Sequence, residues 1–149
     1  MKNILLFLTI LIVGCAKETD VELWQKVIDS RERKSFDSTI LFAQRILKDY
    51  PKSDMIMPST FMLADVYYNN IKNYEKSLFY FKKFTNEYPS HSQTAYSIYF
   101  SGFIYNNHLL NLDSAELYYK KFIKEFPNHE LTHAVKKELI FIESMQKVK

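Results

Sequence analysis

The sequence has only two glycines and one cysteine among its 149 residues. Gly14 and Gly102 stand alone in the chain, so no glycine-rich loop is available to hold a phosphate group. Because Cys15 has no second cysteine to pair with, an intramolecular disulfide is excluded. With four histidines and that single cysteine, the chain also lacks the ligands of a cysteine–histidine metal site. No cofactor is therefore expected.

Net charge and long apolar runs are also scarce. The formal charge is only +3 at pH 7 and the basic residues are dispersed, so no nucleic-acid partner is predicted. The most apolar run, Ile4 to Val13, spans ten residues, whereas a helix that crosses a bilayer needs about 20. Hydrophobic residues make up 47% of the chain, which favours one small domain with a packed core over long disordered segments.

The first residues have the layout of a secretory signal peptide. Lys2 gives a basic start, and the apolar run has the length of a signal-peptide core. The run ends in L-I-V-G followed by Cys15, which resembles the bacterial lipobox. The resemblance implies that residues 1–14 are removed, that Cys15 carries the acyl chains, and that residues 15–19 form a lipidated N-terminus and short tether. An uncleaved hydrophobic anchor is the alternative interpretation.

The residues after Cys15 bear on the membrane in which such an anchor would sit. No aspartate follows Cys15, so the signal that retains lipoproteins of enteric bacteria in the inner membrane is absent. We therefore expect a lipid-anchored protein of the bacterial outer membrane that faces the periplasm. Lys17-Glu18 is similar to the basic–acidic tag of some surface lipoproteins, so the cell surface is the alternative location.

Three prolines mark an internal repeat. Pro51, Pro89 and Pro127 follow one another at intervals of 38 residues. The same positions before each proline carry a capping residue, a large apolar residue, an acid and an aromatic residue: Ser35-Phe36-Asp37 with Tyr50, Asn73-Tyr74-Glu75 with Tyr88, and Asn111-Leu112-Asp113 with Phe126. Repeats of this length are typical of stacked helical units.

The repeat resembles the tetratricopeptide repeat (TPR), a unit of two antiparallel helices with an ideal period of about 34 residues. Small residues stand where TPR helices pack closely: Ala64 and Gly102 in the first helix of a unit, and Thr39, Ser77 and Ala115 in the second. The longer form, which ends in Tyr-Pro or Phe-Pro, is similar to repeats of periplasmic TPR lipoproteins such as the BamD-like family of outer-membrane assembly. The resemblance covers residues 20–149 and implies an all-α superhelix of about three TPR-like hairpins plus a closing helix.

Apolar residues at i, i+3, i+4 and i+7 predict which helix faces are buried. Helices are expected at about 21–33, 36–50, 57–70, 73–89 and 92–107, with later helices before and after Pro127. The aromatic residues expected at core positions are Tyr67, Phe81, Phe84, Tyr105, Tyr119 and Phe122.

In the TPR family a second face of the first helices lines a concave groove that holds partner segments. Carried over by position, that face holds Trp24, Ile28, Arg31, Phe61, Asp65, Tyr68, Tyr99, Phe103 and Asn106. Several of these residues are apolar where solvent exposure would favour polar ones. They are therefore either a partner-binding surface or part of a core that an adjoining helix covers.

One motif suggests enzymatic chemistry. His129-Glu130-Leu131-Thr132-His133 is H-E-x-x-H, which on a helix can bind zinc with the glutamate as general base of a peptidase. The extended motif would need glycine and histidine where the chain has Lys136 and Leu139. His129 also matches Ser53 and His91 in the repeat, so a polar residue at a helix start is the simpler explanation.

The sequence as a whole predicts a non-enzymatic, membrane-anchored TPR lipoprotein that serves as an interaction scaffold or adaptor. Its expected partners are other envelope proteins or peptides, with no catalytic or metal-binding residue. A zinc-dependent peptidase is one alternative. A homo-oligomeric structural lipoprotein is another, because Leu139-Ile140-Phe141-Ile142 covers more of the last helix than one core face needs.

Overall fold

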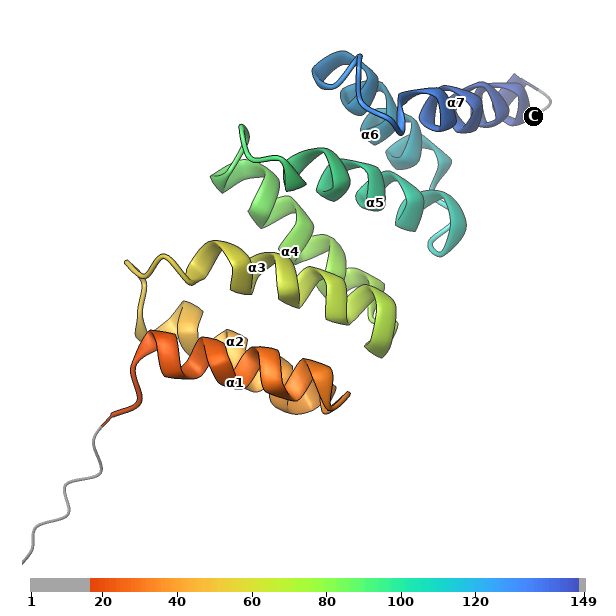
Figure 1. Cartoon of the computed structure of the whole chain (residues 1–149). Helices are drawn as coiled ribbons and strands as arrows, with labels where there is room; N and C mark the ends of the chain where they lie inside the picture. Colours follow the sequence, from red (N-terminus) through yellow and green to blue (C-terminus); the bar gives the residue numbers. More distant parts are fainter. Residues whose placement is uncertain (1–16, 148–149) are drawn as a thin grey trace, which may run out of the picture.

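The computed structural model describes residues 17–147, and within them the chain is built of helices without a strand (Figure 1). In chain order they are α1 (Asp20–Glu32), α2 (Phe36–Asp49), α3 (Ile56–Val66), the π-helical segment η1 (Tyr67–Ile71), α4 (Tyr74–Glu87), α5 (Gln93–Asn107), α6 (Leu112–Glu125) and α7 (Thr132–Lys147). The all-α prediction is confirmed for this part of the chain. The predicted signal peptide and Cys15 lie outside the described residues.

The helices pair into antiparallel hairpins that stack on one another. α1 packs against α2, α3 against α4 and α5 against α6, and each second helix also contacts the first helix of the next hairpin. α7 packs against α6, where the first helix of a fourth hairpin would lie (Figure 1). The start of α1 and the loops from α2 to α3 and from α4 to α5 lie at one edge, on the left of Figure 1. This arrangement confirms the TPR-like fold.

The helix starts follow the capping residues predicted from the repeat, with one exception. Asn73 and Asn111 each accept a hydrogen bond from the backbone N–H three residues later, at 3.0 Å. Thr19 caps α1 and forms a reciprocal capping box with Glu22. The prediction that Ser35 caps α2 through its side chain is wrong. The backbone of Ser35 is close to that of Asn73 and Asn111, and its side chain is shorter than that of asparagine.

Each hairpin turn contains a residue with a left-handed backbone. Lys34, Lys72 and Leu110 have φ between 51° and 60°, and each directly precedes the capping residue. The first turn is one residue shorter, because the N–H of Ser35 donates to the carbonyl of Ser30, whereas the N–H of Asn73 reaches back to Tyr67. The predicted end of the second unit's first helix near 70 is replaced by η1, which absorbs that extra residue.

The left-handed conformation of Leu110 predicts a stabilising substitution. A non-glycine residue is destabilised by about 1–2 kcal/mol in this conformation. Glycine avoids that cost, but its greater conformational freedom in the unfolded chain lowers the stability of the fold by about 0.4–1 kcal/mol. Leu110 is 78% exposed, so its side chain contributes little packing. Leu110→Gly should therefore raise the free energy of unfolding by about 0.5–1 kcal/mol, measured in urea. The matched change Leu117→Gly, at an exposed position inside α6, should lower it by about as much. A lower stability for Leu110→Gly would contradict the assignment.

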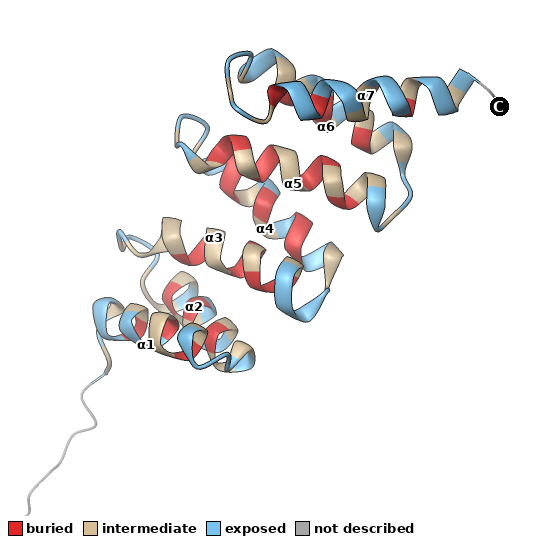
Figure 2. Cartoon of the chain, turned by 45° about the vertical axis from the view of Figure 1, so that its right-hand side comes forward, coloured by how far each residue is buried: buried red, intermediate tan, exposed pale blue. Residues whose placement is uncertain are grey.

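The core lies between the helices as the periodicity predicts. Four of the predicted aromatic core residues are each at most 1% exposed: Phe81, Phe84, Tyr119 and Phe122. Figure 2 shows that the buried residues, in red, lie on the helix faces that turn towards neighbouring helices. The predicted core positions of Phe81, Phe84, Tyr119 and Phe122 are thereby confirmed.

Two tyrosine pairs join the first and second helices within a hairpin, one pair in the second hairpin and one in the third. Tyr67 stacks on Tyr80 with ring centroids 5.8 Å apart, and Tyr105 stacks on Tyr118 at 5.6 Å. Tyr67 is 4% exposed and so belongs to the core, whereas Tyr105 is half-buried. The hydroxyl of Tyr105 accepts a hydrogen bond from the exposed Lys82 at 3.0 Å, so that end of the ring stays at the surface.

Candidate binding face

The nine residues predicted to line a groove all lie on the first helices and are all half-buried. We call the surface that they occupy the first-helix face. They come from α1 (Trp24, Ile28, Arg31), from α3 and η1 (Phe61, Asp65, Tyr68) and from α5 (Tyr99, Phe103, Asn106). Their partial exposure leaves both interpretations open by burial alone, so their contacts must be considered.

The polar residues of the first-helix face connect neighbouring first helices. Arg31 forms an ion pair with Asp65 at 2.5 Å and also donates to Asn70, which joins α1 to the second hairpin. Asn106 donates to Glu138 at 3.1 Å and joins α5 to α7. Because both members of the Arg31–Asp65 pair are partly exposed, the pair adds at most about 1 kcal/mol. Its main effect is to set charged groups side by side on this face.

The aromatic residues of the first-helix face form one patch between η1 and α5. The ring of Phe103 lies 6.4 Å from that of Tyr68 and 6.0 Å from that of Tyr99. His108 completes the patch, 5.9 Å from both Tyr68 and Phe103, and stacks on Tyr74. We call Tyr68, Tyr99, Phe103 and His108 the aromatic patch. Partial burial raises the pKa of Tyr68 and of Tyr99, so both hydroxyls remain neutral donors at pH 7.

Three other apolar members of the predicted site lie apart from the aromatic patch. Phe61 packs edge-on against Phe81 at 6.0 Å and Phe84 at 5.3 Å, so packing accounts for much of its ring. Trp24 packs against the core of the first hairpin, and no aromatic ring stacks on it among residues 17–147. Ile28 is half-buried on α1 beside it. The structure thus narrows the aromatic part of the predicted site to the patch on η1 and α5.

His108 and Glu138 are the members of this surface that the sequence pattern missed. His108 follows the end of α5, so its direction is not given by helical periodicity. Glu138 belongs to α7 and reaches Asn106 only because α7 stacks on the third hairpin. Neither residue carries a repeat signal that would have placed it on this face.

The structure contradicts the helical geometry required for a zinc peptidase. α7 begins at Thr132, so His129 and Glu130 lie in the preceding turn and not one helical turn before His133. The Nδ1 atom of His129 accepts the N–H of Leu131 at 3.2 Å, and Glu130 accepts the hydroxyl of Tyr96 at 2.7 Å.

The repeat explains His129 instead. The same side-chain-to-backbone bond is made by His91 and Ser53 at the equivalent positions of the earlier units. The interpretation of His129 as a helix-start residue is therefore confirmed. Among residues 17–147 no three histidine, cysteine or acidic residues gather as a metal-binding group.

The apolar run on α7 is divided between core and surface. Ile142 is fully buried and Leu139 half-buried, whereas Ile140 and Phe141 are 65% and 58% exposed. Met145, one turn further on, is 49% exposed. Self-association through these residues stays a prediction.

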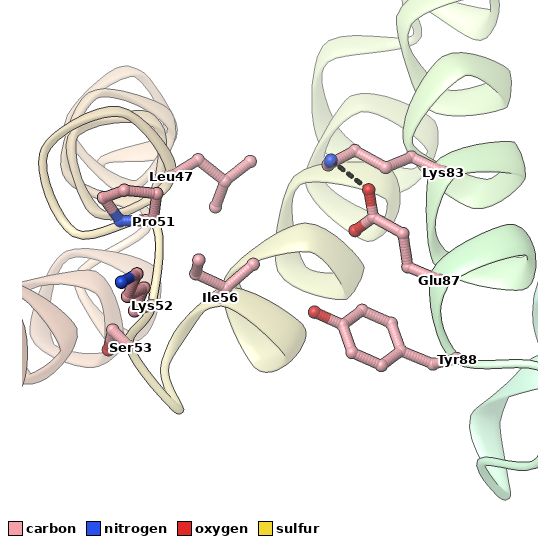
Figure 3. A pocket seen from close by; sticks show the side chains of 8 residues that line it. All are labelled: Leu47, Pro51, Lys52, Ser53, Ile56, Lys83, Glu87 and Tyr88. Carbon is pink, nitrogen blue, oxygen red and sulfur yellow. Dashed lines mark hydrogen bonds and ion pairs between the residues drawn. The ribbon is translucent and has the colours of Figure 1, made fainter.

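A hollow of about 550 Å³ lies on the other side of the hairpins (Figure 3). It opens between the end of α2, the start of α3 and the end of α4. Leu47, Ile56 and Tyr88 give it apolar walls, and the ion pair of Lys83 with Glu87 stands at its rim. It faces the second helices, so it is separate from the first-helix face.

The comparisons with known proteins agree with this architecture. No helix among residues 17–147 has the length and apolar character needed to cross a bilayer. No curated protein matches the chain. A family model named YfiO, described as an outer membrane lipoprotein, matches residues 16–146, which is most of the chain and all of its hairpins. The chain therefore belongs to the YfiO family of outer membrane lipoproteins.

Proposed function

We propose that this chain is an adaptor of the bacterial outer membrane, anchored through a lipid on Cys15, that holds a segment of another envelope protein on its first-helix face. Membership of an outer membrane lipoprotein family supports the location. The match to the family begins at residue 16, directly after Cys15, as expected if the mature protein starts at that cysteine. The domain would then face the periplasm.

The aromatic patch is the observation that carries the binding role. Tyr68, Tyr99 and Phe103 are half-buried, so an apolar side chain of a partner can cover the part of each ring that remains exposed. The carboxylates of Asp65 and Glu138 lie at the neighbouring polar contacts, where they can accept hydrogen bonds from a partner. An aromatic anchor beside hydrogen-bonding groups is the usual composition of a binding hot spot.

The partner's segment is expected to present a large apolar residue flanked by donors. The acceptors of Asp65 and Glu138 favour backbone N–H groups or basic side chains over carboxylates. Arg31 already pairs with Asp65, so it balances part of that negative charge. The proposed role is recognition and requires no reaction.

Photo-crosslinking tests this role in intact envelopes. A benzoylphenylalanine at position 103 should capture an envelope protein, whereas the same residue at position 79, on the second helices, should not. Tyr99→Ala should weaken capture from position 103 by about tenfold or more, as expected for a hot-spot ring. Its thermal midpoint should fall by only a few degrees, about the effect of a half-buried side chain.

Two outcomes would contradict the proposal. Equal capture from positions 79 and 103 would show that the first-helix face has no special role. A large loss of thermal stability in Tyr99→Ala with unchanged capture would show that the aromatic patch serves packing alone.

A further inference from the structure

The exposed side of the second helices repeats one apolar position three times. Leu41 on α2, Phe79 on α4 and Leu117 on α6 stand at intervals of 38 residues. They are 54%, 62% and 67% exposed. A single exposed apolar residue needs no explanation, but the same one on every second helix places apolar groups along one side of the stack. We call this side the second-helix face.

Cationic residues follow each of these apolar positions by about one helical turn. The residues three and four positions later are Gln44 and Arg45 on α2, Lys82 and Lys83 on α4, and Lys120 and Lys121 on α6. Lys48 and Lys124 extend the pattern towards the ends of α2 and α6. The first-turn acids of the same helices lie at their opposite ends. Each of these helices also ends in an acid, Asp49, Glu87 or Glu125, so the second-helix face has a net excess of cationic over acidic residues towards the C-terminal ends of its helices.

Contacts between the hairpins join the three helices into one surface. Gln44 donates to the hydroxyl of Tyr80 at 3.3 Å, and the two helices share a hollow of about 420 Å³ that Phe79 and Lys48 help to line. Lys82 on α4 reaches Tyr105, whose ring stacks on Tyr118 of α6. Among the described residues, Lys48, Lys121 and Lys124 form no ion pair. Their charges are free to meet an external anion.

The chain leaves the domain at the basic end of this face. The carboxylate of Glu18 pairs with Lys26 and with Arg45, the latter at 2.7 Å, and its carbonyl accepts the hydroxyl of Tyr50. These hydrogen bonds from Lys26 and Arg45 lower the pKa of Glu18, so the contact persists at neutral pH. Within the predicted tether of residues 15–19, Glu18 thus contacts the end of α2. Lys17 is two residues from Cys15, a reach of at most about 7 Å.

We propose that the second-helix face lies on the membrane surface and binds anionic phospholipid headgroups. The inference rests on the lipid anchor of the proposed function, which would hold the end of α2 within a few ångströms of the bilayer. Leu41, Phe79 and Leu117 enter the headgroup region, and the lysines beside them extend to the phosphates. A planar surface suits a pattern repeated on three helices. A short segment of a partner protein would need this pattern on only one or two of the helices.

This orientation gives the two faces different roles. The face of the second helices meets lipid, while the aromatic patch on the first helices stays accessible to envelope proteins. The basic face would add an electrostatic contribution to the attachment made by the acyl chains on Cys15.

Site-specific fluorescence on the lipidated protein tests the proposal. Because the sulfur of a lipidated Cys15 is a thioether, a cysteine introduced at 79, 117 or 140 is the only free thiol. Each variant is labelled with a polarity-sensitive dye and reconstituted into phosphatidylcholine vesicles, with or without phosphatidylglycerol, that contain a quencher on the acyl chains. With phosphatidylglycerol, quenching at 79 and 117 should exceed quenching at 140 by about twofold or more, and added salt should reduce it.

A pair of charge variants gives the matched control. Lys121→Glu with Lys124→Glu should lower the quenching at 117 towards the value in phosphatidylcholine alone. Lys136→Glu with Lys137→Glu changes the charge equally on exposed residues of α7, and should leave it unchanged. Equal effects of the two pairs, or equal quenching at 79, 117 and 140, would overturn the proposal. Protection of 79 and 117 only after envelope proteins are added would assign the face to a protein partner instead.

The assay separates the two proposals. A protein that does not float with the vesicles lacks the lipid anchor, and both the anchor and the membrane face then fail. A protein that floats but shows no preferential quenching keeps the anchor and loses only the membrane face.

Discussion

Replacing Phe122 with alanine should lower the free energy of unfolding by about 3–5 kcal/mol, the usual loss for a large aromatic residue in a packed core. Phe122 on α6 is fully buried and lies between α5 and α7. Its ring is 5.8 Å from that of Phe126, 5.4 Å from His129 and 6.5 Å from Tyr99. Removing it leaves a cavity that two helices and a loop would have to close. Urea unfolding monitored by circular dichroism measures the loss.

Phe141→Ala is the matched control for this prediction. It removes the same ring from α7, where the side chain is 58% exposed, so the loss should stay below about 1 kcal/mol. Phe81→Ala in the second hairpin should behave like Phe122→Ala, because Phe81 is 1% exposed. A loss below about 1 kcal/mol at Phe122 would mean that α6 does not join the third hairpin to α7 as described.

Adding a single methyl group at Gly102 should also destabilise the fold. A Cβ atom there would lie 2.6 Å and 2.7 Å from two ring carbons of Tyr119, and 3.2 Å from the Cβ of Tyr118. Tyr119 is fully buried, so its ring has no free space to move into. Alanine gains about 1 kcal/mol of helix propensity over glycine, but overpacking of this kind costs about 1–3 kcal/mol. We therefore expect Gly102→Ala to lower the free energy of unfolding by up to about 2 kcal/mol.

The other hairpins show why this position must be glycine. At the equivalent positions of the earlier hairpins, Val27 and Ala43 belong to one core cluster, and Ala64 and Phe81 to another. The residue on the first helix thus becomes smaller as its partner becomes larger, from Val27 through Ala64 to Gly102 opposite Tyr119.

This size pattern provides the control for Gly102. The double variant Gly102→Ala with Tyr119→Phe copies the pair of the second hairpin and should recover part of the loss. If the Gly102→Ala variant has a higher free energy of unfolding than the native protein, the ring of Tyr119 can move aside.

Local patterns in the sequence predicted the elements of the fold. The 38-residue period, the asparagine caps and the apolar stripes act within one helix or between neighbours in the chain. They therefore identified the hairpins, the buried rings of Phe81 and Phe122, and the role of His129 as a helix-start residue. Ser35 stands at the predicted cap position but makes no side-chain capping bond.

The candidate surfaces depended on how the hairpins stack, which no local pattern gives. Stacking brought Tyr68 of η1 against Phe103 of α5, and Asn106 against Glu138. The stacking also placed much of the ring of Phe61 against the core residues Phe81 and Phe84. The sequence by itself determined the repeat, the helices and their buried faces, since those follow from periodicity along one chain segment. Only the tertiary structure decided which side chains meet across hairpins and which remain exposed, because these contacts join residues that are 30 or more positions apart.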